Sequence, residues 1–294
     1  MEIKTIAAIA TCHNRKDKTL ASLDALFKQK LSDDVQLVVY LVDDGSTDGT
    51  TEAVLQTYPQ VKIIPGDGSL FWNGGMRVAF GEAIKADPDY YLWFNDDTDL
   101  YPNAVAKLLS TYQTLSDLGS ANSIIVGATC DLESGKLTYG GMVQSSWWHP
   151  LKFKLIQPTQ DPQPCHTMNG NCVLIPQKVA GLVGNLDPNF IHSIGDVDYG
   201  LRVRQGGGSV WLAPDYIGTC ATHAKEEDYW ENPHLTWRDR FKKATQAKGL
   251  PPGEWKIFAQ RHAGPFWLFY WGLPYIRLLF AAIRGGKMGS QINI

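Results

Sequence analysis

Short apolar runs alternate with helix-like segments through the first 130 residues, and this alternation constrains the fold more than any other feature. The apolar runs contain no regular polar positions, which is typical of strands buried on both faces; they cover 5–10, 36–42, 61–64, 90–94 and 123–128. Segments between them carry apolar residues three or four positions apart, as one face of a helix does. Strands alternating with helices predict an α/β fold with a Rossmann-like, mostly parallel, doubly wound sheet.

The pattern changes near residue 130 without a low-complexity linker or an internal repeat. Gly140-Gly141 predicts a hairpin, and 172–176 and 210–213 predict two further strands. Between these two strands, residues 195–202 predict the start of a helix. We therefore expect a soft boundary near residue 130 and no clean domain break.

Composition excludes several classes of protein. Hydrophobic residues make up 44% of the chain and charged residues 19%, which is ordinary globular composition. A net charge of -3 provides no basic field for nucleic acid, so we expect no such partner. The five cysteines are scattered and lack CxxC spacing, which argues against a disulfide framework or a zinc site. Reduced thiols and a start without a secretory pattern predict a cytoplasmic protein.

Polar clusters follow three of the predicted strands. They are Thr11-Cys12-His13-Asn14, the run from Asp43-Asp44 to Thr50, and Asn95-Asp96-Asp97. In doubly wound sheets, ligands bind beyond the carboxyl ends of the strands, where these clusters stand. A turn or a helix cap needs one or two such residues, whereas 43–50 holds three acids and two glycines. We therefore interpret the clusters as parts of one binding site.

The acids of the third cluster favour a metal ion. Neighbouring carboxylates repel one another unless they are protonated or bridged by a cation. Mg²⁺ takes oxygen ligands and often binds one or two carboxylates together with substrate phosphates. A solvated acidic loop that caps the next helix is the alternative, and the strongly aromatic strand at 90–94 before it favours the metal site.

The ordered set of motifs resembles family 2 of the glycosyltransferases, which have the GT-A fold. The matching pieces are 10–15, 42–50, Trp72-Asn73-Gly74-Gly75-Met76, Asn95-Asp96-Asp97, and 184–187 leading to 196–202. Their order and spacing fit from residue 5 to about residue 223. Within the family, the rhamnosyltransferase-like branch that builds polysaccharides looks closest.

This resemblance implies a function. A family member would be an inverting glycosyltransferase that moves a sugar from a nucleoside diphosphate (dTDP, UDP or GDP) to a hydroxyl of a glycan or lipid-linked glycan. Mg²⁺ or Mn²⁺ would be the cofactor. Two alternatives are a sugar nucleotidyltransferase, which normally has a glycine-rich and basic phosphate loop near the first strand, and a non-catalytic carbohydrate-binding protein. Intact carboxylates at the motif positions argue against the latter.

The resemblance also implies a role for each matching residue of the donor site. Thr11 and Asp43 would hold the nucleotide base, and Asp44 would be a neighbouring polar contact or a turn former. Asn95 or Asp96 would face the ribose or the sugar, although relatives carry Asp where this chain has Asn95. The remaining expected donor contacts are Asn14, Arg15, Asn73, Gly74 and Arg77, the last of which could reach a phosphate.

The metal and the catalytic base are assigned in the same way. Asp97 would bind the metal. His223 would lie at the metal or the diphosphate, with a purely structural histidine as the alternative. Asp196 matches the catalytic base, with Asp198 as its nearby competitor. Asp196 could also be a helix cap, and a carboxylate at a helix start stays ionised, as a general base must.

Three parts of the chain follow from this assignment. We expect residues 1–130 to bind the nucleotide sugar, 131–248 to form the acceptor side with the catalytic base, and 249–294 to be an aromatic helical tail. The stretch 265–283 is apolar and aromatic, but Gly272, Pro274 and Arg277 interrupt it. It could lie in the membrane interface at the inner face of the cell membrane. The alternative is a helix packed on the catalytic domain or in a homodimer.

Overall fold

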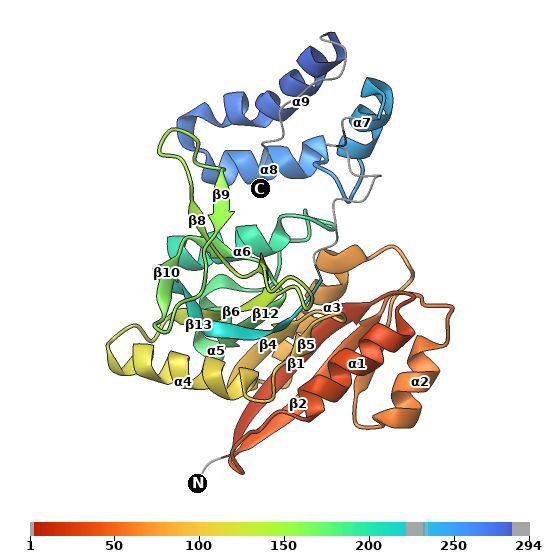
Figure 1. Cartoon of the computed structure of the whole chain (residues 1–294), viewed down its shortest axis with the longest axis vertical. Helices are drawn as coiled ribbons and strands as arrows, with labels where there is room; N and C mark the ends of the chain where they lie inside the picture. The colour runs from red at the N-terminus through yellow and green to blue at the C-terminus, as the bar shows by residue number, and fades with distance from the viewer. Residues whose placement is uncertain (1–2, 222–231, 233–234, 284–294) are drawn as a thin grey trace.

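The computed structural model describes residues 3–221, 232 and 235–283, and a ten-stranded sheet forms its centre (Figure 1). Strand order along the sheet is β10-β13-β6-β12-β4-β1-β2-β3, with β5 paired to β13 and β7 paired to β6. The strands of this sheet are β1 (Lys4–Cys12), β2 (Val35–Asp43), β3 (Lys62–Pro65), β4 (Tyr90–Phe94), β5 (Asp99–Leu100), β6 (Ser123–Cys130), β7 (Leu137–Tyr139), β10 (Gln163–Cys165), β12 (Cys172–Pro176) and β13 (Ser209–Thr219).

The first four strands of the chain pair in parallel, in the part that the sequence predicts to bind the nucleotide sugar. Strands β3, β2, β1 and β4 are parallel to their neighbours, so their carboxyl ends meet at one edge of the sheet. Strand β12 then runs antiparallel to both β4 and β6, and β13 is parallel to β6. Because β12 and β13 come from beyond residue 130 and pair with earlier strands, the sheet is continuous across the expected boundary.

A second, three-stranded sheet lies beside the first. It consists of β8 (Gly141–Gln144), β9 (Phe153–Leu155) and β11 (Thr167–Met168), in the order β11-β8-β9. The predicted hairpin at Gly140-Gly141 is wrong. Strand β7 pairs with β6, whereas β8 pairs with β9 and β11, so this turn passes the chain from one sheet to the other.

Helices cover both faces of the large sheet. They are α1 (Lys16–Phe27), α2 (Thr50–Thr57) and α4 (Ala104–Asp117) on one face, and α3 (Phe71–Ile84), α5 (Gln177–Val183) and α6 (Gly195–Gln205) on the other. In β1, Ile6 and Ala8 belong to the first core, and Ala7 and Ile9 to the second. This double burial explains why the strand is an uninterrupted apolar run.

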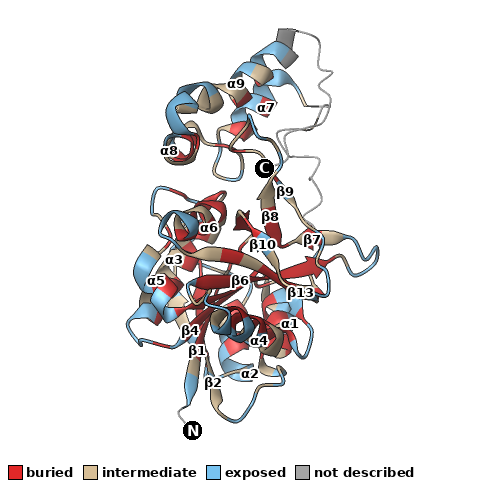
Figure 2. Cartoon of the chain, turned by 90° about the vertical axis from the view of Figure 1, so that its left-hand side faces the viewer, coloured by how far each residue is buried: buried red, intermediate tan, exposed pale blue. Residues whose placement is uncertain are grey.

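The C-terminal helices form a separate layer (Figure 2). They are α7 (Trp237–Ala244), α8 (Pro252–His262), a short 3-10 helix (Gly264–Phe266) and α9 (Trp267–Ile283). Trp255 and Phe258 of α8 are buried in a third core with Val197 of α6 and Phe153 of β9. The third core therefore joins this layer to α6. Among the described residues, every helix is too short or too polar to cross a bilayer.

Candidate active site

The loop after β2 is shaped by Asp43, which is only 5% exposed. Its Oδ1 accepts a hydrogen bond from the backbone N–H of Ser46 at 2.9 Å, and its other oxygen accepts one from Thr51. Asn14, from the loop after β1, braces the same segment by accepting from the N–H of Thr47 at 2.7 Å. The two predicted donor residues therefore lie on adjacent loops at one edge of the sheet.

Asp44 holds a turn. Its side chain is 4% exposed, and its two oxygens accept from the backbone N–H groups of Gly68 (2.8 Å) and Phe71 (3.0 Å). These bonds tie the segment that enters α3 to the end of β2. Of the two roles expected for Asp44, its contacts favour the turn former.

The start of α3 lies against the end of β1. An ideal Cβ at Gly75 would lie 2.1 Å from Oγ1 of Thr11, so a side chain at this position would force the helix away from the strand. Gly74 is half-buried beside Leu70. The glycine-rich motif thus permits a close approach of helix and strand, which brings Thr11 and α3 together.

Asn73 is fully buried, and its side-chain amide forms hydrogen bonds within the protein. Its Nδ2 donates to the carbonyl oxygens of Asp187 (3.1 Å) and Phe190 (2.6 Å). An ideal Cβ at Gly195 would lie 1.8 Å from Oδ1 of Asn73. Asn73 therefore holds the loop that leads into α6, and Gly195 provides the space for it.

Arg77 lies one turn further along α3. Its backbone carbonyl accepts from Nδ2 of Asn185 at 2.9 Å, and its side chain is half-buried. Within the part of the chain that the structure describes, no carboxylate forms an ion pair with its guanidinium. This positive charge is available to a ligand.

Arg15 joins β1 to the acidic cluster. Its Nη1 lies 3.1 Å from Oδ1 of Asp96 and 2.9 Å from Oδ2 of Asp97, and both acidic side chains are less than 10% exposed. Burial raises the pKa of Asp96 to about 6, against the lowering effect of Arg15. Burial alone would lower the pKa of Arg15, but the two carboxylates together have a larger effect, so the net pKa of Arg15 is raised. Arg15 is thus a fixed cation between two crowded acids.

The metal expected from the sequence would bind the carboxylate of Asp97, with that of Asp96 beside it. Searched over the described residues, the structure contains no group of three or more His, Cys, Asp or Glu side chains able to hold a metal. A site of one or two carboxylates completed by a diphosphate needs no third protein ligand of this kind. The second predicted metal ligand, His223, lies outside the described residues.

Trp72 connects the acidic cluster to the start of α6, and the sequence alone assigned it no role. Its Nε1 donates to Oδ1 of Asn95 at 2.9 Å. An ideal Cβ at Gly170 would lie 2.6 Å from the indole ring, so the ring rests directly on this glycine. The N–H of Gly170 in turn donates to Oδ2 of Asp196 at 2.8 Å. The only indication of this role in the sequence is that Trp72 is the first residue of the glycine-rich motif.

Asp196 occupies the first turn of α6 and is half-buried. Its two oxygens accept from the N–H groups of Gly170 and Val197, both at 2.8 Å. Burial raises the pKa of Asp196 above that of an ordinary carboxyl, and these two hydrogen bonds offset the effect only in part. A partly accessible carboxylate with a raised pKa suits a general base.

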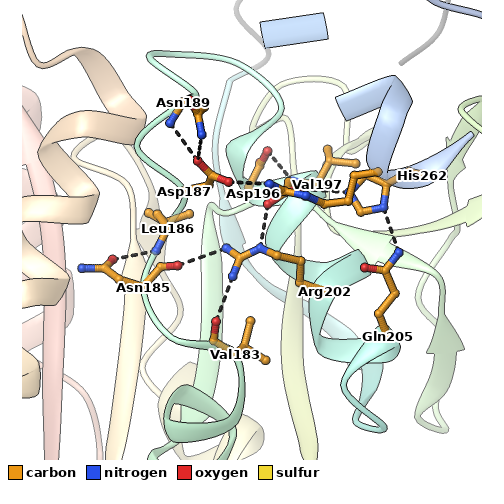
Figure 3. A network of polar contacts seen from close by, with 12 residues as sticks. Val183, Asn185, Leu186, Asp187, Asn189, Asp196, Val197, Arg202, Gln205 and His262 are labelled. Atoms are coloured by element: carbon orange, nitrogen blue, oxygen red, sulfur yellow. Dashed lines mark hydrogen bonds and ion pairs between the residues drawn. The ribbon is translucent and has the colours of Figure 1, made fainter. Parts of the chain in front are cut away.

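Asp198, the competitor, is fully buried and forms ion pairs. Figure 3 shows two of its partners, Arg202 and His262. Its oxygens lie 2.7 Å from Nε of Arg202, 2.5 Å from Nη1 of Arg261 and 2.9 Å from Nε2 of His262. Burial opposes its ionisation, but His262 and the two arginines outweigh burial and lower the pKa of Asp198. This carboxylate links α6 to α8 and has no surface for a substrate.

A chain of contacts places Asp97 and Asp196 at the same edge of the sheet. Sγ of Cys220 donates to Oδ1 of Asp97 at 3.6 Å, and Nδ2 of Asn171 lies 3.6 Å from the same sulfur. Asn171 directly follows Gly170, the residue that binds Asp196. Asp97 and Asp196, from separate parts of the chain, are therefore linked by a continuous series of contacts.

Sequence comparison identifies the family. Residues 7–180 match the profile of glycosyl transferase family 2, and this stretch is more than half of the 294 residues. The chain belongs to this family and is a glycosyltransferase. It is also 24% identical over 279 residues to N-acetylglucosaminyl-diphospho-decaprenol L-rhamnosyltransferase of Mycobacterium tuberculosis, covering 88% of this chain and 82% of the relative. The expected resemblance to the rhamnosyltransferase-like branch is confirmed.

Comparison with solved structures confirms the GT-A fold. Mannosyltransferase PcManGT from Pyrobaculum calidifontis, in complex with GDP-Man and Mn²⁺, has a TM-score of 0.55 at 15% identity, over 96% of this chain and 76% of that one. S. aureus TarS has a TM-score of 0.55 at 13% identity over 88% of this chain, which spans only 42% of the TarS chain. GalNAc-T7 with UDP, GalNAc and Mn²⁺ has a TM-score of 0.53 at 13% identity, covering 80% of this chain and 50% of that one.

Proposed function

We propose that this glycosyltransferase is metal-dependent and inverting, and that it moves a sugar from a nucleoside diphosphate to a glycan hydroxyl during cell-surface polysaccharide synthesis. One observation carries the proposal. Asp196 is half-buried, and contacts through Gly170 and Trp72 connect it to Asn95 in the acidic cluster. The carboxylate of Asp198, in contrast, is occupied by ion pairs. The site thus holds one accessible base beside one acidic cluster.

The proposed reaction is a single displacement. Asp196 removes the proton from the acceptor hydroxyl, and the oxygen forms a bond to the anomeric carbon of the donor sugar. The bond from that carbon to the diphosphate breaks on the opposite face, and its electron pair leaves with the diphosphate. Attack opposite the leaving group inverts the configuration, and the proton stays on Asp196 until it is released to water.

Asp97 would hold Mg²⁺ or Mn²⁺, with Asp96 beside it. The bound cation supplies electrostatic stabilisation of the leaving diphosphate. Both acids lie against the cationic Nη1 of Arg15, so a bound metal ion would share these carboxylates with the guanidinium. Two structural relatives are described with Mn²⁺, and this supports metal use here. The sequence-based assignment of His223 to the metal remains part of this proposal.

The remaining donor contacts follow the edge of the sheet. Thr11 and Asp43 would hold the nucleotide base, because they end the adjacent strands β1 and β2. Arg15 and Arg77 are the cations placed to meet phosphates, and Asn95 or Asp96 would face the ribose or sugar. Asn14, Gly74 and Asn73 would support the site by bracing its loops.

Three parts of the chain would divide this work. Residues 1–130 bind the nucleotide sugar, residues 131–248 provide the acceptor side and the base, and residues 249–294 form the C-terminal layer. The contacts of Asp198 with Arg261 and His262 support an integral role for the last part, since they fasten α8 to the catalytic helix.

A lipid-linked acceptor at the inner face of the cell membrane would suit the aromatic surface of the C-terminal layer. Residues of α9 such as Trp271 and Tyr275 pack inward, so one face of the helix does cover the domain. The opposite face is open, and its large apolar side chains are between 46% and 70% exposed: Phe266, Leu268, Phe269, Ile276, Leu279 and Phe280. The loop bearing Trp147, which is 93% exposed, meets α9 where Tyr270 bonds to the carbonyl of Trp148. Aromatic residues with a nearby cation, Arg277, favour a bilayer interface.

Vesicle binding separates this surface from a homodimer. The double variant Phe269→Ser, Phe280→Ser changes exposed side chains and keeps the packed face of α9. If the surface meets lipid, this variant should pellet less with anionic vesicles than the native chain. Unchanged pelleting, or a change of oligomeric state without a change in pelleting, would contradict the membrane contact.

Donor binding and stereochemistry test the reaction itself. UDP-, dTDP- and GDP-sugars should be screened by thermal shift with and without Mn²⁺, and the product of the best donor examined by NMR. We expect one donor class to stabilise the protein only with the metal, and the new linkage to have the configuration opposite to the donor. A retained configuration would contradict the single displacement.

A further inference from the structure

A cavity lies apart from the donor-side residues. Its volume is about 290 Å³, and it lies between the C-terminal part of α6, the end of α8 and the three-stranded sheet. Arg204 of α6 and His262 of α8 line it, together with His166 between β10 and β11. Arg204 is eight residues beyond Asp196, which corresponds to about 12 Å along a helix. The reaction proposed above uses none of these lining side chains.

The polar wall of the cavity is cationic and donor-rich. Nδ1 of His166 accepts from the backbone N–H of Gln144 at 3.3 Å, so the ring proton is on Nε2. His262 has both ring nitrogens engaged, Nε2 with Asp198 and Nδ1 with Gln205 (Figure 3). Within the described residues, the wall contains no acid and Arg204 has no carboxylate partner. An exposed guanidinium and one N–H donor therefore remain for an anion.

The cavity also has an apolar wall. It is formed by Pro150, Phe153 and Leu201, of which Phe153 is only 3% exposed. A small anion such as chloride would leave this wall uncovered. Ligand sites combine apolar surface with a few convergent polar groups, and this cavity has both.

We propose that this cavity binds a phosphate or diphosphate group through Arg204 and Nε2 of His166, with an apolar substituent of the ligand against Phe153 and Leu201. Arg204 presents a fork of donors that matches phosphate oxygens, and charge-assisted bonds of this kind are among the strongest in proteins. The phosphate could come from a lipid diphosphate or from a free phosphate compound. This site does not depend on the proposed transfer reaction.

The test follows the imidazole signals of the full chain by NMR in the presence of EDTA. Inorganic pyrophosphate and farnesyl diphosphate are titrated separately, and the signal of His166 is assigned with H166Q. We expect a saturable shift of the His166 signal with both probes. R204Q should weaken binding roughly tenfold to a hundredfold, the range for losing a hydrogen bond to a charged group. R204K should recover part of the loss.

Two controls test whether the phosphate probe binds in this cavity. R238Q removes an exposed arginine on α7 and should leave the affinity unchanged. His13 reports on the other site, because its Nδ1 lies 2.5 Å from the carbonyl oxygen of Asp44. A shift of His13 without His166, or equal affinity in R204Q and the native chain, would overturn the proposal.

The two probes distinguish the sources of the phosphate. Tighter binding of farnesyl diphosphate than of pyrophosphate supports a lipid diphosphate lying on the apolar wall. Equal affinity supports the phosphate contacts and overturns the part of the proposal that places an apolar substituent against Phe153 and Leu201.

Discussion

Asp196 and Asp198 lie two residues apart on α6, and their carboxylates have opposite surroundings. Asp196 is half-buried and receives two backbone N–H groups, whereas Asp198 is fully buried against two arginines and a histidine. Burial raises the pKa of the first, and the cationic partners lower the pKa of the second. This difference supports the proposal that Asp196 is the base, and it gives Asp198 a structural role.

Asp198→Asn should destabilise the protein by about 3–5 kcal/mol, because it removes the buried carboxylate that Arg202 and Arg261 share, although Arg261 keeps its ion pair with Asp187. The pKa of Asp198 is lowered in the folded state, so its contribution is present above the unfolded pKa and is lost as pH falls below that value. Chemical denaturation at pH 7 and at pH 3 measures both effects.

Asp215→Asn is the matched control, since Asp215 is 60% exposed and forms a surface ion pair with Lys107. A loss of stability in D198N no larger than in this control would contradict the structural role. So would an equal penalty for D198N at both pH values.

The pH dependence of kcat/KM should report Asp196. A general base must be ionised, so the rate should fall as pH decreases through its pKa. Because burial raises that pKa, the acidic limb should lie at a higher pH than an ordinary carboxyl would give. A limb at the pKa of an exposed aspartate, or none, would argue against this environment.

Trp72→Phe should reduce kcat roughly tenfold while the fold persists, because it removes the N–H that holds Asn95 and keeps most of the ring on Gly170. Steady-state kinetics and a melting curve check the two parts of this expectation. Trp237→Phe, an exposed site on α7, is the control. Unchanged kcat in W72F would show that the link between the acidic cluster and α6 has no role in the reaction.

Asp97→Ala should abolish the metal-dependent part of donor binding, because it removes the expected metal ligand. Calorimetric titration of the donor with and without Mn²⁺ measures this part. Asp99→Asn changes an exposed acid two residues away and should retain it. Equal dependence on Mn²⁺ in D97A and the native chain would place the cation elsewhere.

The sequence predicted the strands and the acidic edge because those signals are local. The apolar run at 5–10 marks β1, which extends from Lys4 to Cys12, since double burial excludes polar side chains from its length. The carboxyl ends of parallel strands meet by geometry alone, so the convergence of the polar clusters follows from strand order.

The missed features depend on partners far away in the chain. Asp198 and Arg261 are 63 positions apart. The residues around each of them contain no pattern that predicts this ion pair. Nδ2 of Asn73 donates to the carbonyl oxygens of residues 187 and 190, which lie 114 and 117 positions further along the chain. Gly140 suggested a hairpin because a glycine pair is a local signal for a turn. The sheet to which β8 belongs depends instead on its pairing with β9 and β11.

Asp196→Asn is the most direct test of the account, because it removes the base and keeps the shape of the side chain. We expect kcat to fall by about a thousandfold, within the range for general-base catalysis, while the dissociation constant of the donor stays unchanged. Single-turnover transfer and donor titration on the same protein preparation give both numbers. Transfer near the native rate, or a loss of donor affinity as large as the loss of rate, would contradict the role of Asp196.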